Sequence, residues 1–211
     1  MTQTHLMELA SMVRSGHASY DTLEKSALGV DDNQLDKWDE EFHSLSYSRL
    51  LAIVNNRETD SRVLGAMALG EINGEVVRAA VLNPSTCPGA LVVMAYKPWD
   101  SCFKKEVASN PSTPSWTLTH LSQRGDARIV EAVAKNVSTP IDTLCRLVLD
   151  TRYRRAALSN LALPDWIVAD FCKVSDSDRA FARSEIERKR EIMHDLSFRA
   201  SLAMVDMLHH S

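Results

Sequence analysis

The chain has 211 residues and a net charge of −4 at neutral pH, and its hydrophobic content of 45% is typical of a globular protein rather than a disordered one. With 7 Gly and 7 Pro it is neither collagen-like nor of low complexity. No apolar run approaches the roughly 20 residues that span a bilayer, and no secretory signal follows Met1. We therefore expect a cytoplasmic protein without a membrane partner.

The N-terminal region, residues 1–48, is expected to form three helices. Thr4 precedes the first, Ser19 can cap a second that ends near Gly29, and Asp31 precedes a third. Their apolar positions recur at spacings of three and four, which is helical periodicity, and comprise Leu6, Leu9, Val13, Leu35, Trp38, Phe42 and Leu45. Residues 1–50 hold four basic and nine acidic side chains, which argues against nucleic-acid binding at this end. We interpret the region as a cap over the apolar face of the first repeat.

The middle of the chain, residues 49–175, repeats itself. Asparagines recur at spacings of 27, 26 and 24 residues, and stepping back 27 from the first reaches another: Asn56, Asn83, Asn110, Asn136 and Asn160. Eight and eleven residues after each stands an apolar pair: Leu64/Met67, Leu91/Met94, Leu118/Leu121, Leu144/Leu147 and Val168/Phe171. Each pair lies on one face of a short helix that needs covering. The sequence therefore predicts about five stacked units of 24–27 residues.

Within each unit, the local sequence predicts where two short helices begin and end. Threonine before proline, as in Thr113-Pro114, predicts a hydroxyl that caps a short first helix. An acidic residue, Asp100, Asp126 or Asp150, is placed to cap a second helix rich in Ala and Val. The recurring Asn is expected to end that helix in left-handed geometry. No unit contains a β-branched run bounded by turns, so we predict an all-α chain.

These motifs resemble those of the leucine-rich repeat variants, which are related to HEAT-type repeats. The segments that carry the resemblance are Val77-Arg78-Ala79-Ala80-Val81 with Asn83-Pro84, and the run from Glu106 to Pro114. The resemblance implies a right-handed α-solenoid in which α-helices alternate with short, often 3₁₀, helices. It does not extend to the iron–sulfur module known in that family, because residues 1–80 contain no Cys. The family has no common activity, so the resemblance leaves function open.

The C-terminal region, residues 176–211, is expected to be a helical cap. A helix begins at Asp176 or Asp178 and carries a charged stretch from Glu185 to Glu191, which is typical of a solvated surface. An apolar stripe follows at Ile192, Leu196, Ala200, Ala203 and Met207. This stripe either covers the last repeat or joins two copies of the chain in a homodimer.

Candidate partner-binding residues are basic and aromatic. Equivalent positions on successive second helices, with neighbours, carry cations that form a partial ridge, interrupted by Val130 and Glu131: Arg78, Lys104, Lys105, Arg128, Arg152, Arg154 and Arg155. Trp116 and Trp166 share one position in the repeat, and Trp99 falls in a turn beside Pro98, where an exposed Trp would anchor a partner.

Catalytic signals are weak. The seven histidines show no metalloprotease spacing, His120 is expected to be a surface or satisfied residue, and there is no nucleophile elbow or phosphate-binding glycine loop. The four cysteines form no C-x-x-C pair, so neither a disulfide framework nor a zinc site is indicated, and no cofactor or metal is expected: Cys87, Cys102, Cys145 and Cys172. The sequence favours a non-enzymatic module that binds a protein as adaptor, scaffold or inhibitor. The alternative is a nucleic-acid-binding solenoid, conceivably a HEAT-like DNA glycosylase using Trp116 and Asp126.

Overall fold

The computed structural model describes residues 3–97, 101–171 and 176–209, and within these it is helical, with no strand. The all-α prediction is therefore confirmed for this part of the chain. One 3₁₀ turn, Ser101–Phe103, precedes α8. The helices are α1 Gln3–Arg14, α2 Tyr20–Leu28, α3 Asp32–Ser44, α4 Tyr47–Asn55, α5 Ser61–Leu69, α6 Gly74–Leu82, α7 Pro88–Tyr96, α8 Lys104–Ser109, α9 Ser115–Arg124, α10 Ala127–Lys135, α11 Ile141–Leu149, α12 Arg154–Leu158, α13 Asp165–Phe171 and α14 Asp176–His209.

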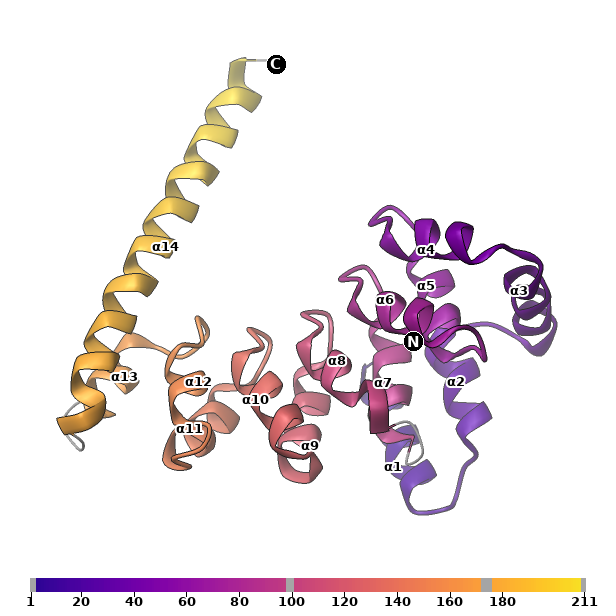
Figure 1. The fold of residues 1–211 in the computed structure, drawn as a ribbon, viewed down its shortest axis with the longest axis horizontal. Coiled ribbons are helices and arrows are strands. Elements are labelled where there is room, and N and C mark those ends of the chain that lie inside the picture. The colour runs from indigo at the N-terminus through magenta and orange to yellow at the C-terminus, as the bar shows by residue number, and fades with distance from the viewer. Residues whose placement is uncertain (1–2, 98–100, 172–175, 210–211) are drawn as a thin grey trace. The chain divides into compact units, whose positions relative to one another are not determined.

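The chain divides into two compact units, residues 1–143 and 144–211. In the first unit, α4, α6, α8 and α10 follow one another in a row, each packed against the next. Helices α5, α7 and α9 form a second row in contact with the first (Figure 1). This double row is what the recurring apolar pairs require, because each short helix exposes a face that its neighbours must cover.

Helices α2 and α3 begin where the local sequence predicts, whereas α1 begins at Gln3 and not after Thr4 as expected. The Ser19 hydroxyl accepts a hydrogen bond from the Thr22 backbone N–H at 3.1 Å, and Gly29 ends α2 in the left-handed region at φ 67°. The Asp31 carboxylate accepts from the Gln34 N–H at 2.9 Å at the start of α3. These ends are set by neighbouring residues alone, so sequence suffices to place them.

The N-terminal helices pack against the second row, where α2 and α3 contact α5 of the first repeat and the contacts of α1 and α2 extend beyond it to α7. Helices α1 and α2 lie against α7, and α3 lies against α5. Side chains of α1, α2 and α7 share one buried cluster: Leu6, Leu9, Ala10, Val13, Leu23, Val92 and Val93. The physical reason lies in α7, because its residues from Gly89 to Ala95 are all apolar and all buried. A helix that is apolar all round must be covered on every side.

The recurring asparagines join consecutive repeats. The Asn110 amide donates to the Val81 carbonyl at 2.6 Å and to the Asn83 carbonyl at 2.9 Å, while its Oδ1 accepts from the Ser112 N–H at 2.8 Å. Asn83 and Asn136 make the same set of bonds, two from the amide to the preceding repeat and one from the Ser N–H two residues later to Oδ1, and all three Asn side chains are buried. We call this series of bonds the asparagine ladder.

The expected left-handed geometry of these asparagines was wrong. Asn110 has φ −74° and ψ 126°, which is extended backbone, and no residue other than glycine has a positive φ in the described chain. Asn83 and Asn110 both precede proline, whose ring disfavours the helical region for the residue before it and moves ψ toward about +120 to +160°. The extended conformation ends the helix and aims the Asn side chain at the preceding repeat.

The threonines also act differently from the expectation. The Thr113 hydroxyl donates backward to the Val107 carbonyl at 2.5 Å, at the end of the helix before it, and Thr86 and Thr139 do the same to residues six positions earlier. They stabilise the C-terminal end of the second helix and do not cap the first. The capping role assigned to Asp126 is confirmed, since its carboxylate accepts from the N–H groups of Arg128 and Ile129. Asp100 lies outside the described residues.

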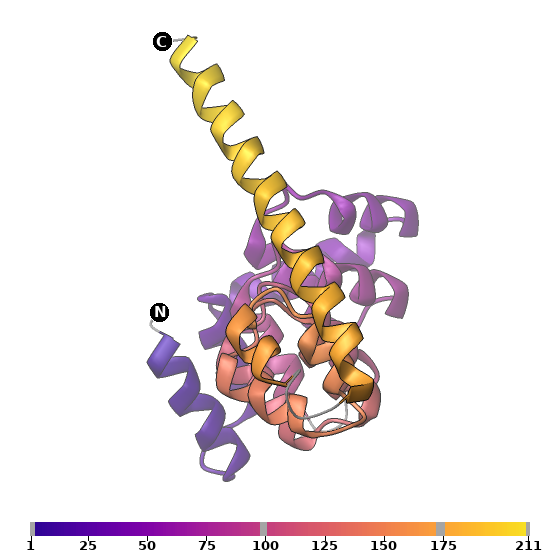
Figure 2. The ribbon, with the colours of Figure 1, turned by 90° about the vertical axis from the view of Figure 1, so that its left-hand side faces the viewer.

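The second compact unit ends in a single long helix, α14, which follows α13 (Figure 2). Its first half packs against α13 and buries Ala182, while the Lys189 ammonium donates to the Leu163 carbonyl at 3.0 Å. Burial lowers the pKa of Lys189, with Asp165 and Glu185 acting in the opposite direction. No helix in the described chain has the length and apolarity needed to cross a membrane.

Candidate partner-binding surface

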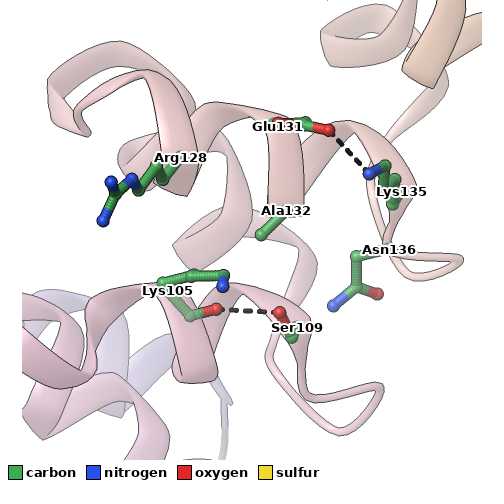
Figure 3. A pocket seen from close by; sticks show the side chains of 7 residues that line it. All are labelled: Lys105, Ser109, Arg128, Glu131, Ala132, Lys135 and Asn136. Atoms are coloured by element: carbon green, nitrogen blue, oxygen red, sulfur yellow. Dashed lines mark hydrogen bonds and ion pairs between the residues drawn. The ribbon is translucent and has the colours of Figure 1, made fainter.

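A groove of about 400 Å³ lies between α8 and α10 in the first unit. Figure 3 shows Lys105 and Ser109 on the α8 side facing Arg128, Glu131 and Lys135 on the α10 side. Ala132 and Asn136 complete the lining. We call it the basic groove, because three of its side chains are cationic and one is anionic.

The cations of the basic groove differ in how far they are already engaged. Lys135 Nζ donates to the Glu131 carboxylate at 2.6 Å, and this bond is the main reason that the pKa of Glu131 lies below its usual range, with Lys105 contributing as a nearby charge. By contrast, the Lys105 ammonium and the Arg128 guanidinium make no hydrogen bond or ion pair with any described residue. Both are exposed. The groove therefore contains two cationic side chains, Lys105 and Arg128, that are available to bind a ligand.

The repeat explains why Lys105 points outward. Lys105 stands five residues before Asn110, and the same position carries Arg78 before Asn83 and Glu131 before Asn136. All three of these charged side chains are exposed. Because the ladder fixes the register of each helix, whatever residue occupies this position faces solvent on the same row.

The predicted basic ridge is not continuous along this row. Arg78 Nε lies 3.3 Å from the Glu106 carboxylate, so its charge is compensated within the fold. The groove that it lines, between α4 and α6, also holds Glu75, which accepts a hydrogen bond from the Tyr47 hydroxyl. Lys104 is half-buried and acts as one of the charges near His120. Of the predicted cations in the first unit, only Lys105 and Arg128 line a common groove.

The three predicted arginines of the second unit are all engaged within it. Arg152 forms two hydrogen bonds to Asp150 and lies over the Tyr153 ring at 5.2 Å. Arg154 Nε donates to the Val148 carbonyl at 3.0 Å, and the Arg155 guanidinium lies 5.4 Å from the centre of the Phe181 ring. The predicted Trp99 lies outside the described residues.

The two tryptophans that share a repeat position have different environments. Trp116 is half-buried against the cluster of α1, α2 and α7, and its ring centre lies 5.9 Å from that of Tyr96. Trp166 on α13 is 68% exposed and is the more accessible of the two. On α14, Met193 and Leu196 are exposed. The side chains of Ala200, Ala203 and Met207, which belong to the expected stripe, lie outside the part of the chain whose side chains are described. The homodimer stays a prediction.

His120 is a packing residue. Its ring stacks on Tyr96 with 4.2 Å between ring centres. Burial first, and then the charges of Arg124, Arg14 and Lys104, lower the pKa of His120 to about 4. The imidazole is therefore neutral at pH 7, as a ring stacked among cations should be.

Sequence reasoning missed Lys135 and Ser109 as groove residues. Both stand immediately before a ladder asparagine, the position that also places Leu82 in the groove between α4 and α6. The repeat register therefore contained the signal. Comparisons of the chain with protein-family models, with curated proteins and with solved structures found no match. The resemblance to the leucine-rich repeat variants thus rests on the residues of the repeat itself.

Proposed function

We propose that residues 49–175 form a right-handed α-solenoid of the leucine-rich repeat variant type, related to HEAT repeats, with helical regions at both ends. The asparagine ladder supports this, because the same bonds recur at Asn83, Asn110 and Asn136, and in each case the two amide bonds link the repeat to the one before it. Repeat proteins of this kind bind partners through extended surfaces. In such a solenoid, equivalent surface side chains of successive repeats are regularly spaced.

We further propose that the protein is a non-enzymatic binding module whose basic groove holds an acidic segment of a partner protein. The observation that carries this is the pair Lys105 and Arg128, two exposed cations without a partner in the described fold, on a chain that is negatively charged overall. A guanidinium can bind a carboxylate through two parallel hydrogen bonds. Lys135 offsets the charge of Glu131, the one carboxylate that lines the groove, so Lys105 and Arg128 leave the groove with a net positive charge.

The same cations can bind phosphate, so the alternative is a nucleic-acid ligand. The glycosylase reading has less support, because its two named side chains have structural roles: Asp126 caps α10, and Trp116 packs against the N-terminal helices. Two cations in one groove also make few phosphate contacts, which predicts weak binding with a shallow dependence on salt. Acidic protein segments are therefore the favoured ligand.

The experiment compares three proteins with two labelled probes by fluorescence anisotropy. The probes are a short peptide rich in Glu and a short duplex DNA, both measured at low and at physiological ionic strength. The proteins are the wild type, Lys105→Glu/Arg128→Glu, and the control Lys37→Glu/Arg49→Glu, which makes the same change of charge at exposed positions outside the groove. We expect the groove variant to bind the peptide about tenfold or more weakly, and the control to bind as the wild type does.

Two results would overturn the proposal. If the control variant loses as much affinity as the groove variant, net charge and not the groove is responsible. If the wild type binds duplex DNA tightly and the peptide not at all, the nucleic-acid alternative replaces it.

A further inference from the structure

The first compact unit contains a second groove, which shares no residue with the basic groove. It has a volume of about 570 Å³ and lies among α2, α3 and the end of α5. Pockets that hold small-molecule ligands have volumes of roughly 300–1,000 Å³, so this groove is large enough to take side chains of a partner. The side chains that line it are Asp21, Glu24, Leu28, Leu35, Asp36, Trp38, Asp39, Phe42, His43, Ala66, Leu69, Glu71 and Lys97, together with Gly70.

The floor of this groove is apolar and only partly covered. Leu35, Trp38 and Phe42 follow one another on α3 at spacings of three and four, so they share one face of the helix. Phe42 is buried at 5% exposure, whereas Leu35, Trp38 and Leu69 of α5 are half-buried. A partly exposed Trp within a groove is the kind of residue that anchors a partner.

The rim of the groove is acidic. Five of its lining residues are carboxylates, against one lysine and one histidine. Glu24 pairs with the Lys97 ammonium, and the Asp39 carboxylate lies 3.4 Å from His43 Nδ1, which is hydrogen-bonded to the Asp39 backbone carbonyl at 2.8 Å. The other three, Asp21, Asp36 and Glu71, make no hydrogen bond or ion pair with a described residue, and all three are exposed.

Lys25, a cation that interacts with the rim but does not line the groove, already has a partner. Lys25 pairs with Asp32, and that hydrogen bond is the main reason that its pKa is raised, with Asp21 and Asp36 adding to the effect. The three unengaged carboxylates also come from three segments, α2, α3 and the residues after α5. Within the described chain no three acidic, His or Cys side chains gather closely enough to hold a metal ion. Such spread charges suit a ligand that carries several separated cations.

We propose that this acidic groove binds a cationic amphipathic segment of a partner protein. Apolar side chains of the segment pack on Leu35 and Trp38, and its Lys or Arg side chains pair with Asp21, Asp36 and Glu71. The choice of occupant follows from charge complementarity, because the rim offers unpaired carboxylates above an apolar floor. This surface carries the opposite charge to the basic groove, and the two would bind different segments.

The test uses the full chain and a labelled synthetic peptide in which Leu and Lys are arranged at helical spacing. A peptide with Glu in place of Lys is the matched negative probe. We expect the Lys peptide to bind at low salt and to weaken as salt screens the rim, whose charges act over about 8 Å at physiological ionic strength. The Glu peptide should not bind.

Charge-reversal variants locate the site. Asp36→Lys/Glu71→Lys should bind the Lys peptide about tenfold or more weakly, because like charges then face each other. The control Glu8→Lys/Glu58→Lys makes the same change of charge at exposed positions outside the groove and should bind normally. Lys105→Glu/Arg128→Glu should also bind normally, which separates this proposal from the function assigned to the basic groove.

Trp38→Ala tests the floor. It should weaken peptide binding without changing the response to salt, and circular dichroism checks that α3 is retained. If removing Trp38 unfolds α3, the comparison of Asp36→Lys/Glu71→Lys with its control still tests whether the groove binds the peptide. Equal loss in the groove and control variants would overturn the proposal, as would tight binding of the Glu peptide. Self-association that Asp36→Lys/Glu71→Lys abolishes, without any peptide binding, would show that a second copy is the occupant and that the proposed partner is wrong.

Discussion

Replacing Asn110 with alanine tests whether the asparagine ladder holds the repeats together. The substitution removes three hydrogen bonds of a side chain that is 1% exposed. The Asn83 carbonyl keeps a partner, because it also accepts from the Thr86 N–H at 3.1 Å, but the Val81 carbonyl and the Ser112 N–H lose theirs. A buried group left without a partner costs about 1–3 kcal/mol, and the Ser112 N–H is only partly buried, so we expect a total loss of about 2–4 kcal/mol.

Asn56→Ala is the matched control. Asn56 stands at the same position of its repeat, but it is exposed and its side chain makes a single described bond, to the Glu58 N–H at 3.0 Å. We expect a loss below about 1 kcal/mol. Urea denaturation followed by circular dichroism gives the free energy of unfolding of each variant, with unchanged slopes as the check that the transition is comparable.

Asn110→Asp sharpens the same test. It preserves the size of the side chain and the acceptor for Ser112, but places an oxygen against the Val81 and Asn83 carbonyls where the amide donated. Burial and these carbonyls favour the protonated acid, so its folded pKa is raised above its unfolded value. Its stability relative to wild type should therefore improve as pH falls. If Asn110→Ala costs no more than Asn56→Ala, the ladder does not stabilise the stack and the reasoning fails.

Two further predictions follow from packing. Gly89→Ala should lower the free energy of unfolding by about 2–4 kcal/mol, because a Cβ at this position overlaps the Ala27 carbonyl and comes within 2.9 Å of the Ala27 Cα. The control Gly74→Ala, whose Cβ meets nothing closer than 3.9 Å, should be neutral or stabilising in urea denaturation. Equal losses in the two variants would contradict the close contact of α2 with α7. His120→Phe should remove a pH dependence of stability: the folded pKa of about 4 lies below the unfolded 6.5, so wild type loses stability as pH falls from 6.5 toward 4. After allowance for the half-exposed ring this loss is about 1–2 kcal/mol, and a variant that retains it would show that another group titrates.

Local chemistry made parts of this fold predictable from sequence. Ser19, Gly29 and Asp31 act through bonds to residues within four positions, so the ends of α2 and α3 could be placed without knowing the fold. The spacing of the asparagines likewise predicted a repeated unit. It did not predict what Asn110 does, because its partners lie 27 and 29 residues earlier and become neighbours only when the repeats stack.

The position of the N-terminal helices and the state of the arginines were beyond local reasoning. The apolar stripe of α1 shows that it must pack, but α7 alone, without a polar face, indicates where a covering layer is needed. Arg78 has a carboxylate partner, Glu106, in the next repeat, and Arg155 has an aromatic one, Phe181, in α14. Such partners decide which cations remain available, so a count of basic residues overestimates the binding surface.

Each repeat combines buried positions that stay the same with an exposed position that varies. In the repeats of Asn83, Asn110 and Asn136 the asparagine and threonine are buried and make the same bonds, so we expect them to set the spacing and to carry no specificity. Five residues before the asparagine, the exposed side chain changes from Arg78 to Lys105 to Glu131, and its partner changes with it. For the proposed binding function, we therefore expect specificity to depend on this varying position, with the asparagine and threonine as a fixed frame. If that is correct, exchanging the charges of Lys105 and Glu131 should preserve the free energy of unfolding while altering which peptide binds. A variant that loses stability instead would show that these positions belong to the frame.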